Sequence, residues 1–363
     1  MNKLSTSSKN SMHTREITAV VLLGVLIPCV LFGNWAFFIL MVLLSIVGVS
    51  EILRAPGPKK YNIWVKLVVY VFVLSFIFWV FLKNYLSDHD YYSGNRFYMT
   101  DIFVSITGII LYALVLFLIA VITSKVQLSD VTYLFTMGIV FALGFQGMFF
   151  LRYFPNGTGV IRYTDYLTYP SWNSSGVAFG EYFTSYYSAY NLNQTLCSSV
   201  IFFFMLIGTW AGDAGAYFVG ILFGKHRMNP RISPHKTWEG FFGGMLISIV
   251  CSLSFAALLE YGFNIPLIPG LVQFHNSDLL LSMNVLGGHA VVFMVILAAL
   301  MPIVGNVGGF LYSLVKRQFG IKDFGTIFPG HGGVIDRFDS IMINSIAMSI
   351  IIYLTANAWA FTL

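Results

Sequence analysis

The residues of this sequence that could do chemistry gather in one segment, residues 313–340. Seven of these 28 residues are charged, a quarter of the segment, against 10% of the whole chain. Lys316, Arg317 and Lys322 can neutralise phosphate charge. The glycine-rich turn Pro329-Gly330-His331-Gly332-Gly333 follows, and glycine tolerates the backbone conformations that direct several N–H groups at one anion. This pattern predicts a phosphate-binding site.

Two carboxylates complete the segment. Asp336 and Asp339 lie at i and i+3, hence on one face at the start of a predicted helix. They would repel each other unless a cation lay between them, and hard oxygen ligands beside phosphate-binding groups favour Mg²⁺. A basic loop that only sets membrane topology is the alternative interpretation. It accounts for the lysines and arginines, but for neither the turn nor the paired acids.

A second set of polar residues precedes this segment. Asp213 lies inside a predicted membrane span, where an ionised side chain is costly and marks a candidate functional residue. A purely structural role, as the partner of a buried Lys, Arg or Tyr, is the alternative for it. Ser233, Lys236 and Thr237 lead into a predicted helix from Trp238. Hydroxyls, an amine and free N–H groups at a helix start suit phosphate.

The elements that position both sets must be membrane helices. Of the 363 residues, 57% are hydrophobic and 10% are charged, whereas a soluble domain carries about 25% charged residues. This composition excludes a cytosolic enzyme, a secreted disulfide scaffold and a disordered chain. An apolar stretch of about 20 residues crosses a bilayer as a helix. Nine such stretches predict an all-α polytopic membrane protein: residues 17–33, 35–53, 64–82, 102–122, 131–151, 197–223, 241–261, 289–315 and 341–361.

The eighth stretch carries Pro302 and the run Gly305 to Gly309. Proline removes a helical hydrogen bond, so we expect this stretch to kink or unwind inside the bundle.

Orientation follows from the basic residues. With a cytoplasmic N-terminus, sixteen of the 20 Lys and Arg residues lie on the cytoplasmic side, as the positive-inside rule requires. The net charge of +5 is then a topology signal, and no nucleic-acid partner is expected. Residues 1–151 are predicted to form an N-terminal region of five spans, and residues 152–196 an extracytoplasmic loop rich in Tyr, Ser and Asn. Residues 197–363 would form a C-terminal region of four spans, with cytoplasmic loops 224–240 and 313–340.

The polar residues of both sets resemble the motifs of one family, the phosphatidate cytidylyltransferases, also called CDP-diacylglycerol synthases. The family signature reads here as Ser313-x-x-Lys316-Arg317, Lys322-Asp323-x-Gly325, Pro329-Gly330-His331-Gly332-Gly333 and Asp336-Arg337-x-Asp339. A second motif of the family is matched upstream by Asp213-x-x-Ala216-Tyr217, Phe223-Gly224-Lys225 and Ser233-Pro234-x-Lys236-Thr237-x-Glu239-Gly240, which are similar to it. The N-terminal spans resemble the family only in hydropathy.

The resemblance implies an enzyme of the cell membrane that converts CTP and phosphatidic acid into CDP-diacylglycerol and pyrophosphate. It implies Mg²⁺ as the cofactor, with a second cation left open, held by Asp336 and Asp339 and with Asp213 as a further ligand or support. These three acids and Lys236 would be the catalytic residues. The residues implied in binding CTP and phosphate are Ser233, Lys236, Thr237, Ser313, Lys316, Arg317, Lys322, His331, Gly332, Gly333 and Arg337. Membrane lipids would surround the chain, and a homodimer is left open.

Three positions depart from the family pattern. The family has Gly-Asp-Leu-x-Glu-Ser just before the Lys-Arg pair, and here Gly309 stands for the Asp and Tyr312 for the Glu. His235 stands where Lys is usual. Asn306, about one helical turn before Gly309, is a candidate source of the missing oxygen.

Three other functions stay open at this point. A CTP-dependent lipid kinase of the dolichol-kinase type would use the same phosphate-binding residues. A family member with weakened catalysis would keep lipid or nucleotide binding. A transporter or channel, with Asp213 and the eighth stretch lining its pathway, agrees least with carboxylates at a cytoplasmic helix start.

Overall fold

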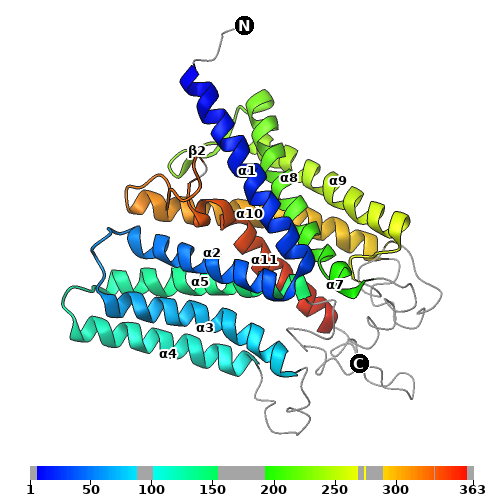
Figure 1. Cartoon of the computed structure of the whole chain (residues 1–363). Helices are drawn as coiled ribbons and strands as arrows, with labels where there is room; N and C mark the ends of the chain where they lie inside the picture. Colours follow the sequence, from blue (N-terminus) through cyan, green and yellow to red (C-terminus); the bar gives the residue numbers. More distant parts are fainter. Residues whose placement is uncertain are drawn as a thin grey trace. The chain divides into compact units, whose positions relative to one another are not determined.

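The computed structural model describes residues 6–87, 101–153, 193–268, 274, 289–330 and 332–357. These residues are almost entirely helical (Figure 1). The chain divides into two compact units, each made of several segments. Unit 1 comprises Met1–Phe78, Asn95–Leu143 and Leu311–Asp339, and unit 2 comprises Trp79–Gly94, Gly144–Phe310 and Ser340–Leu363. The predicted extracytoplasmic loop, residues 152–196, lies mostly outside the described residues, as does His331.

Each predicted stretch corresponds to a helix, but α1 begins 11 residues before the predicted residue 17 and α11 begins seven residues before the predicted residue 341. Their bounds are α1 Thr6–Phe32, α2 Asn34–Arg54, α3 Ile63–Ser87, α4 Asp101–Ile122, α5 Leu128–Tyr153, α7 Gln194–Cys197, α8 Val200–Phe223, α9 Trp238–Phe263, α10 Ala290–Gln318 and α11 Val334–Asn357. Within the described residues, α2, α5, α8, α9 and α10 are long and apolar enough to cross a membrane. Shorter apolar segments lie in α1, α3 and α4. The structure is therefore that of an all-α membrane protein, while the number of nine spans and their orientation stay predictions.

Two short strands were not predicted. β1 (Arg227–Asn229) and β2 (Ser233–Thr237) pair antiparallel, with Arg227 opposite Thr237 and Asn229 opposite Ser233. They form a ribbon in the loop between α8 and α9, and β2 runs directly into α9.

Polar contacts between backbone and side chains join the helices of unit 1. The hydroxyl of Tyr133 on α5 donates to the Ile52 carbonyl on α2 (2.9 Å), and that of Tyr112 on α4 donates to the Leu134 carbonyl on α5 (2.9 Å). The Tyr112 ring also stacks on Phe72 of α3, with centroids 3.9 Å apart. Each hydroxyl thus finds a partner in the apolar interior, as buried polar groups require.

Asp130, at the start of α5, is a buried carboxylate of unit 1. It forms an ion pair with Lys60, and its Oδ2 accepts a hydrogen bond from the Gln127 backbone N–H (3.0 Å). Burial, with Asp130 alongside, raises the pKa of the Tyr61 hydroxyl, which stays protonated and donates to Asp130 Oδ1 (3.2 Å).

Unit 2 is held together by close approaches between helices at small residues. A Cβ on Gly244 of α9 would lie 2.5 Å from the Gly212 carbonyl oxygen of α8. A Cβ on Gly147 of α5 would lie 2.7 Å from the Ser345 carbonyl oxygen of α11. Small residues let backbones approach closely, which is a main source of helix association in membranes.

The sequence predicts a kink or unwinding in the eighth stretch; unwinding is wrong, because α10 is one continuous helix through Pro302, and a kink stays a prediction. Pro302 cannot donate to the Ala298 carbonyl one turn earlier. The hydroxyl of Ser248 on α9 lies 3.1 Å from that carbonyl oxygen and 2.9 Å from the Gly208 carbonyl oxygen of α8, so its one proton is shared between the two, and the Asn306 side-chain amide donates to the Pro302 carbonyl (2.9 Å). Because the Ala298 and Pro302 carbonyl groups both have side-chain donors, α10 can stay helical through Pro302. Gly305 allows close packing on Ser340 and Asn344 of α11.

The α8–α9 contact predicts a stability difference between two glycines of α9. Gly244→Ala should lower the free energy of unfolding by about 1–3 kcal/mol, because the new methyl group meets backbone atoms that cannot move aside. Gly262→Ala is the matched control, since nothing lies within 4 Å of its Cβ position, and it should be neutral or stabilising. Thermal unfolding in detergent micelles measures both. Equal midpoints for the two variants would contradict this packing.

Candidate functional site

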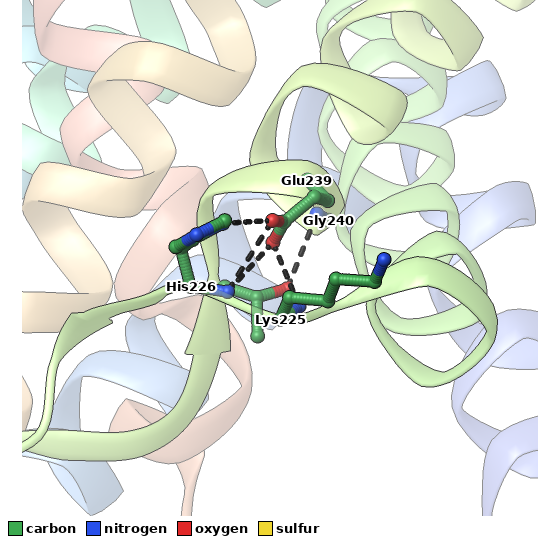
Figure 2. Close-up of polar contacts among 5 residues, drawn as sticks. Lys225, His226, Glu239 and Gly240 are labelled. Carbon is green, nitrogen blue, oxygen red and sulfur yellow. Dashed lines mark hydrogen bonds and ion pairs between the residues drawn. The ribbon is translucent and has the colours of Figure 1, made fainter.

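In unit 2, Glu239 fixes the ribbon to the start of α9 (Figure 2). Its carboxylate accepts hydrogen bonds from the backbone N–H groups of Lys225 (3.1 Å) and His226 (3.2 Å), and Oε1 lies 2.6 Å from His226 Nδ1. Thr237 is the N-cap of α9, and its hydroxyl accepts from the Gly240 N–H (3.2 Å). The motif residues on β2 are therefore held in a defined place relative to α9.

Lys236 extends from this ribbon to α10. Its Nζ donates to Asn306 Oδ1 (2.9 Å) and lies 4.7 Å from the centre of the Phe310 ring. A Cβ at Gly309 would lie 2.9 Å from the same Nζ. At the position where the family pattern has an acid, this chain thus places a lysine amine over a glycine. The Asn306 oxygen, suggested by the sequence as a substitute ligand, accepts a hydrogen bond from that amine.

The other predicted residues of unit 2 are Ser233 and Asp213. Ser233 is half-buried on β2, and Asp213 is exposed on α8.

In unit 1, Asp336 connects three parts of the signature segment. Its Oδ1 accepts from Lys316 Nζ at the end of α10 (2.9 Å). Its Oδ2 accepts from the backbone N–H groups of Phe324 (2.8 Å) and Gly333 (3.0 Å). The side chain is 3% exposed. The sequence predicted Asp336 as a metal ligand, and the structure adds that its carboxylate organises the loop between α10 and α11.

Other predicted residues of unit 1 lie near Lys316 and Asp336 in the sequence, on the two helices that the loop joins. Ser313 and Arg317 lie in the last turns of α10, and Arg337 and Asp339 in the first turns of α11. Tyr312, which replaces an acid of the family pattern, is fully buried and its ring meets Phe324 edge-on, with centroids 6.1 Å apart.

The glycine-rich turn closes on itself. Phe328 and Gly332 each donate their backbone N–H to the carbonyl of the other, at 3.0 and 3.1 Å. Gly330 and Gly332 have φ values of 74° and 88°, a region that side chains disfavour. Thr18 of α1 donates its hydroxyl to the Pro329 carbonyl (3.1 Å). The turn is thus tied at its base and held by α1.

A cavity of about 520 Å³ lies beside this turn in unit 1, within the size range of small-molecule sites. Lys322 and Arg337 give it positive charge, and Asp323 adds one acid. Its lining comprises Lys322, Asp323, Gly325, Thr326, Phe328, Pro329, Gly330, Gly332 and Arg337. All of these residues belong to the signature segment, and the two cationic side chains could neutralise phosphate charge there.

Glu51 of α2 is the residue that sequence reasoning missed. It is 4% exposed, and its two carboxylate oxygens accept hydrogen bonds from the backbone N–H groups of Val334 (3.0 Å) and Ile335 (2.9 Å). The signal that singled out Asp213, an acid within an apolar stretch, applies equally to Glu51.

The carboxylates fit a Mg²⁺ ion only together with a substrate. Among the residues that the structure describes, no three His, Cys, Asp or Glu side chains form a group that could hold a metal. Asp336 Oδ1 accepts one hydrogen bond, so it keeps a lone pair, and Asp339 follows one turn later. Mg²⁺ is usually bound by one or two carboxylates plus phosphate oxygens and water, which this pair suits.

Comparison with known proteins agrees with the motifs. A family model described as the cytidylyltransferase family matches residues 13–355. This chain belongs to the cytidylyltransferase family. Membership confirms the resemblance seen in the motifs and extends it over the N-terminal helices, for which the motifs had given a likeness in hydropathy only.

Curated relatives in this family are named phosphatidate cytidylyltransferase. One from Staphylococcus epidermidis strain RP62A is 37% identical over 143 residues, and those from Staphylococcus haemolyticus JCSC1435 and Staphylococcus aureus COL are 34% and 33% identical over the same length. Each alignment covers 39% of this chain and 44% of the relative. The chain thus spans less than half the length of the curated relatives it matches.

The Lys316–Asp336 pair predicts a stability effect. Lys316→Met should lower the free energy of unfolding by about 3–5 kcal/mol, because it leaves a buried carboxylate without its cation. In the double variant Lys316→Met/Asp336→Asn the loss should be smaller than the sum of the two single losses, since no charge remains buried. Denaturant unfolding in micelles measures all three. Additive losses would show that the two side chains do not interact.

Proposed function

We propose that this protein transfers the cytidylyl group of CTP to phosphatidic acid, giving CDP-diacylglycerol and pyrophosphate, in phospholipid biosynthesis. The observation that carries the proposal is the cavity of unit 1, which has two cationic side chains and a glycine turn and lies in a member of the cytidylyltransferase family. The names of the curated relatives support the same reaction.

The reaction needs charge neutralisation more than covalent chemistry. A phosphate oxygen of phosphatidic acid attacks the α-phosphorus of CTP in line. The bond from that phosphorus to the oxygen bridging to the β-phosphate breaks, and pyrophosphate leaves with the bonding electrons. Positioning and electrostatic stabilisation supply most of the catalysis in such transfers. We assign Lys322 and Arg337 to the phosphates of CTP, because both line the cavity.

We assign Mg²⁺ to Asp336 and Asp339, with substrate oxygens completing its shell. When bound, the ion would neutralise charge on the reacting phosphates. Lys316 holds the Asp336 carboxylate in place from the end of α10. Asp213, Ser233, Lys236 and Thr237 of unit 2 are assigned to the same reaction from the family motif, as phosphate-binding and supporting residues.

The proposed enzyme works on the cytoplasmic side of a cell membrane. This side follows from the distribution of the 20 Lys and Arg residues. Its substrates would be CTP from the cytoplasm and phosphatidic acid from the bilayer. Whether the protein forms a homodimer is left open.

One observation favours a second candidate, a family member with weakened catalysis that retains nucleotide or lipid binding. Lys236 Nζ lies where a side chain on Gly309 would begin, so an acid of the family pattern is replaced by a glycine beside an amine. Such a protein would bind CTP and release little pyrophosphate.

The first test is an assay of the purified protein with CTP and phosphatidic acid in detergent micelles. CDP-diacylglycerol and pyrophosphate should form in equal amounts when Mg²⁺ is present and cease with EDTA. Asp339→Asn should lower the rate by about 100-fold, because charge stabilisation of the reacting phosphates is lost. Binding of CTP without turnover would favour the second candidate. CDP and a newly phosphorylated lipid would identify a lipid kinase.

Lys322 predicts an effect on CTP affinity alone. Lys322→Met removes a charge-assisted contact worth about 1.5–3 kcal/mol, so KM for CTP should rise about tenfold or more. Because the Lys322 side chain is exposed, the unfolding midpoint should not change. Lys125→Met is the matched control, an exposed lysine at the turn between α4 and α5. An unchanged KM in Lys322→Met would remove Lys322 from the nucleotide site.

A further inference from the structure

Glu51 lies near the C-terminal end of α2, far along the sequence from the signature segment. Its side chain is buried, and its carboxylate accepts hydrogen bonds from Val334 and Ile335, 283 and 284 positions away. We propose that Glu51 is a positioning residue, which sets the place of the glycine turn and of the first turn of α11 and thereby shapes the nucleotide cavity. This role rests on the function proposed above.

Glu51 lies at the start of α11, where backbone N–H groups need partners. Val334 and Ile335 are the first two residues of α11, and the first N–H groups of a helix have no partner within it. Buried without partners, they would each cost about 1–3 kcal/mol. The carboxylate of Glu51 satisfies both, and its negative charge interacts favourably with the positive end of the helix dipole. Glu51 therefore fixes where α11 begins.

Two glycines, Gly325 and Gly333, pack on the Glu51 carboxylate. A Cβ added to Gly333 or to Gly325 would overlap the Glu51 carboxylate. Neither glycine has a positive φ, unlike Gly330 and Gly332. Space around Glu51, and not backbone conformation, is what these two positions require. Two glycines of the family signature are thus explained by a residue of α2, outside the signature.

The residues that Glu51 contacts lie in or next to the wall of the cavity. Gly325 lines it directly, as does Gly332, the neighbour of Gly333. Gly333 also donates its N–H to Asp336, so Glu51 and Asp336 hold the same short stretch from two sides. Movement of this stretch would change both the cavity wall and the place of the Asp336 carboxylate. Glu51 acts on the nucleotide through the backbone that it holds.

The test compares Glu51→Gln with Asp130→Asn. The glutamine keeps one accepting oxygen but directs an NH₂ group at the second backbone N–H, so one hydrogen bond is lost without a change in volume. Asp130→Asn is the matched control, because it also turns a buried carboxylate of unit 1 that accepts a backbone N–H into an amide. Two quantities are measured in each variant: amide hydrogen exchange at Val334 and Ile335 without ligand, and the KM for CTP.

We expect exchange at these two amides to accelerate about tenfold and KM for CTP to rise about tenfold in Glu51→Gln only. Unchanged exchange in Glu51→Gln would overturn the contact. Faster exchange with an unchanged KM would overturn the positioning role and show that Glu51 only caps the N-terminus of α11. Equal changes in Asp130→Asn would also overturn it, by showing a general loss of stability. If the wild-type protein makes no CDP-lipid, the proposed function fails while the exchange result still decides whether Glu51 holds the turn.

A second variant pair tests the same contact in the other direction. Gly325→Ala should raise KM for CTP about tenfold, because the methyl group displaces the carboxylate. In Glu51→Ala the carboxylate is absent, so adding Gly325→Ala to this variant should not raise the KM for CTP any further. Multiplicative effects in the double variant would show that Gly325 and Glu51 act independently, and would contradict the proposal.

Discussion

The start of α11 is the point on which the signature segment of unit 1 depends. Two buried carboxylates, Glu51 and Asp336, accept the backbone N–H groups of Gly333, Val334 and Ile335. Gly333, Val334 and Ile335 are buried, so their N–H groups cannot form hydrogen bonds with water and need partners within the protein. Because the partners are charged, their hydrogen bonds are stronger than those of neutral groups. The glycine turn, the cavity and the Lys316 ion pair all follow from this arrangement.

The same requirement for internal partners shapes unit 2. Pro302 leaves the Ala298 carbonyl without its helical donor, and Ser248 of a neighbouring helix supplies one. Glycines also allow the backbones of α8 and α9 to approach closely, and the same Ser248 hydroxyl lies 2.9 Å from the Gly208 carbonyl oxygen of α8. Lys236 extends into this packed region and contacts Asn306, over Gly309. At the position where this chain departs from the family pattern, a lysine amine therefore lies close to the glycine.

Much of this could be predicted from local sequence, and the rest depends on distant contacts. The apolar stretches predicted the helices, because membrane helices need about 20 apolar residues whatever surrounds them. The density of charge in residues 313–340 indicated the segment that contains the cavity lining and Asp336, while the roles of these residues stay predictions. The sequence could not show that Glu51 contacts Val334, since no spacing rule connects residues 283 positions apart. The unwinding expected at Pro302 was wrong for the same reason, because Ser248 comes from another helix. The strands β1 and β2 are too short, at three and five residues, to give a periodic pattern.

The central claim, that this member of the cytidylyltransferase family moves the α-phosphate of CTP to a lipid, is tested most directly by following the two ends of the triphosphate. The purified protein is given phosphatidic acid, Mg²⁺ and CTP radiolabelled at either the α- or the γ-phosphate. Cytidylyl transfer places the α-label in the lipid fraction and the γ-label in pyrophosphate. A γ-label in the lipid, or no label in the lipid from either substrate, would contradict the account.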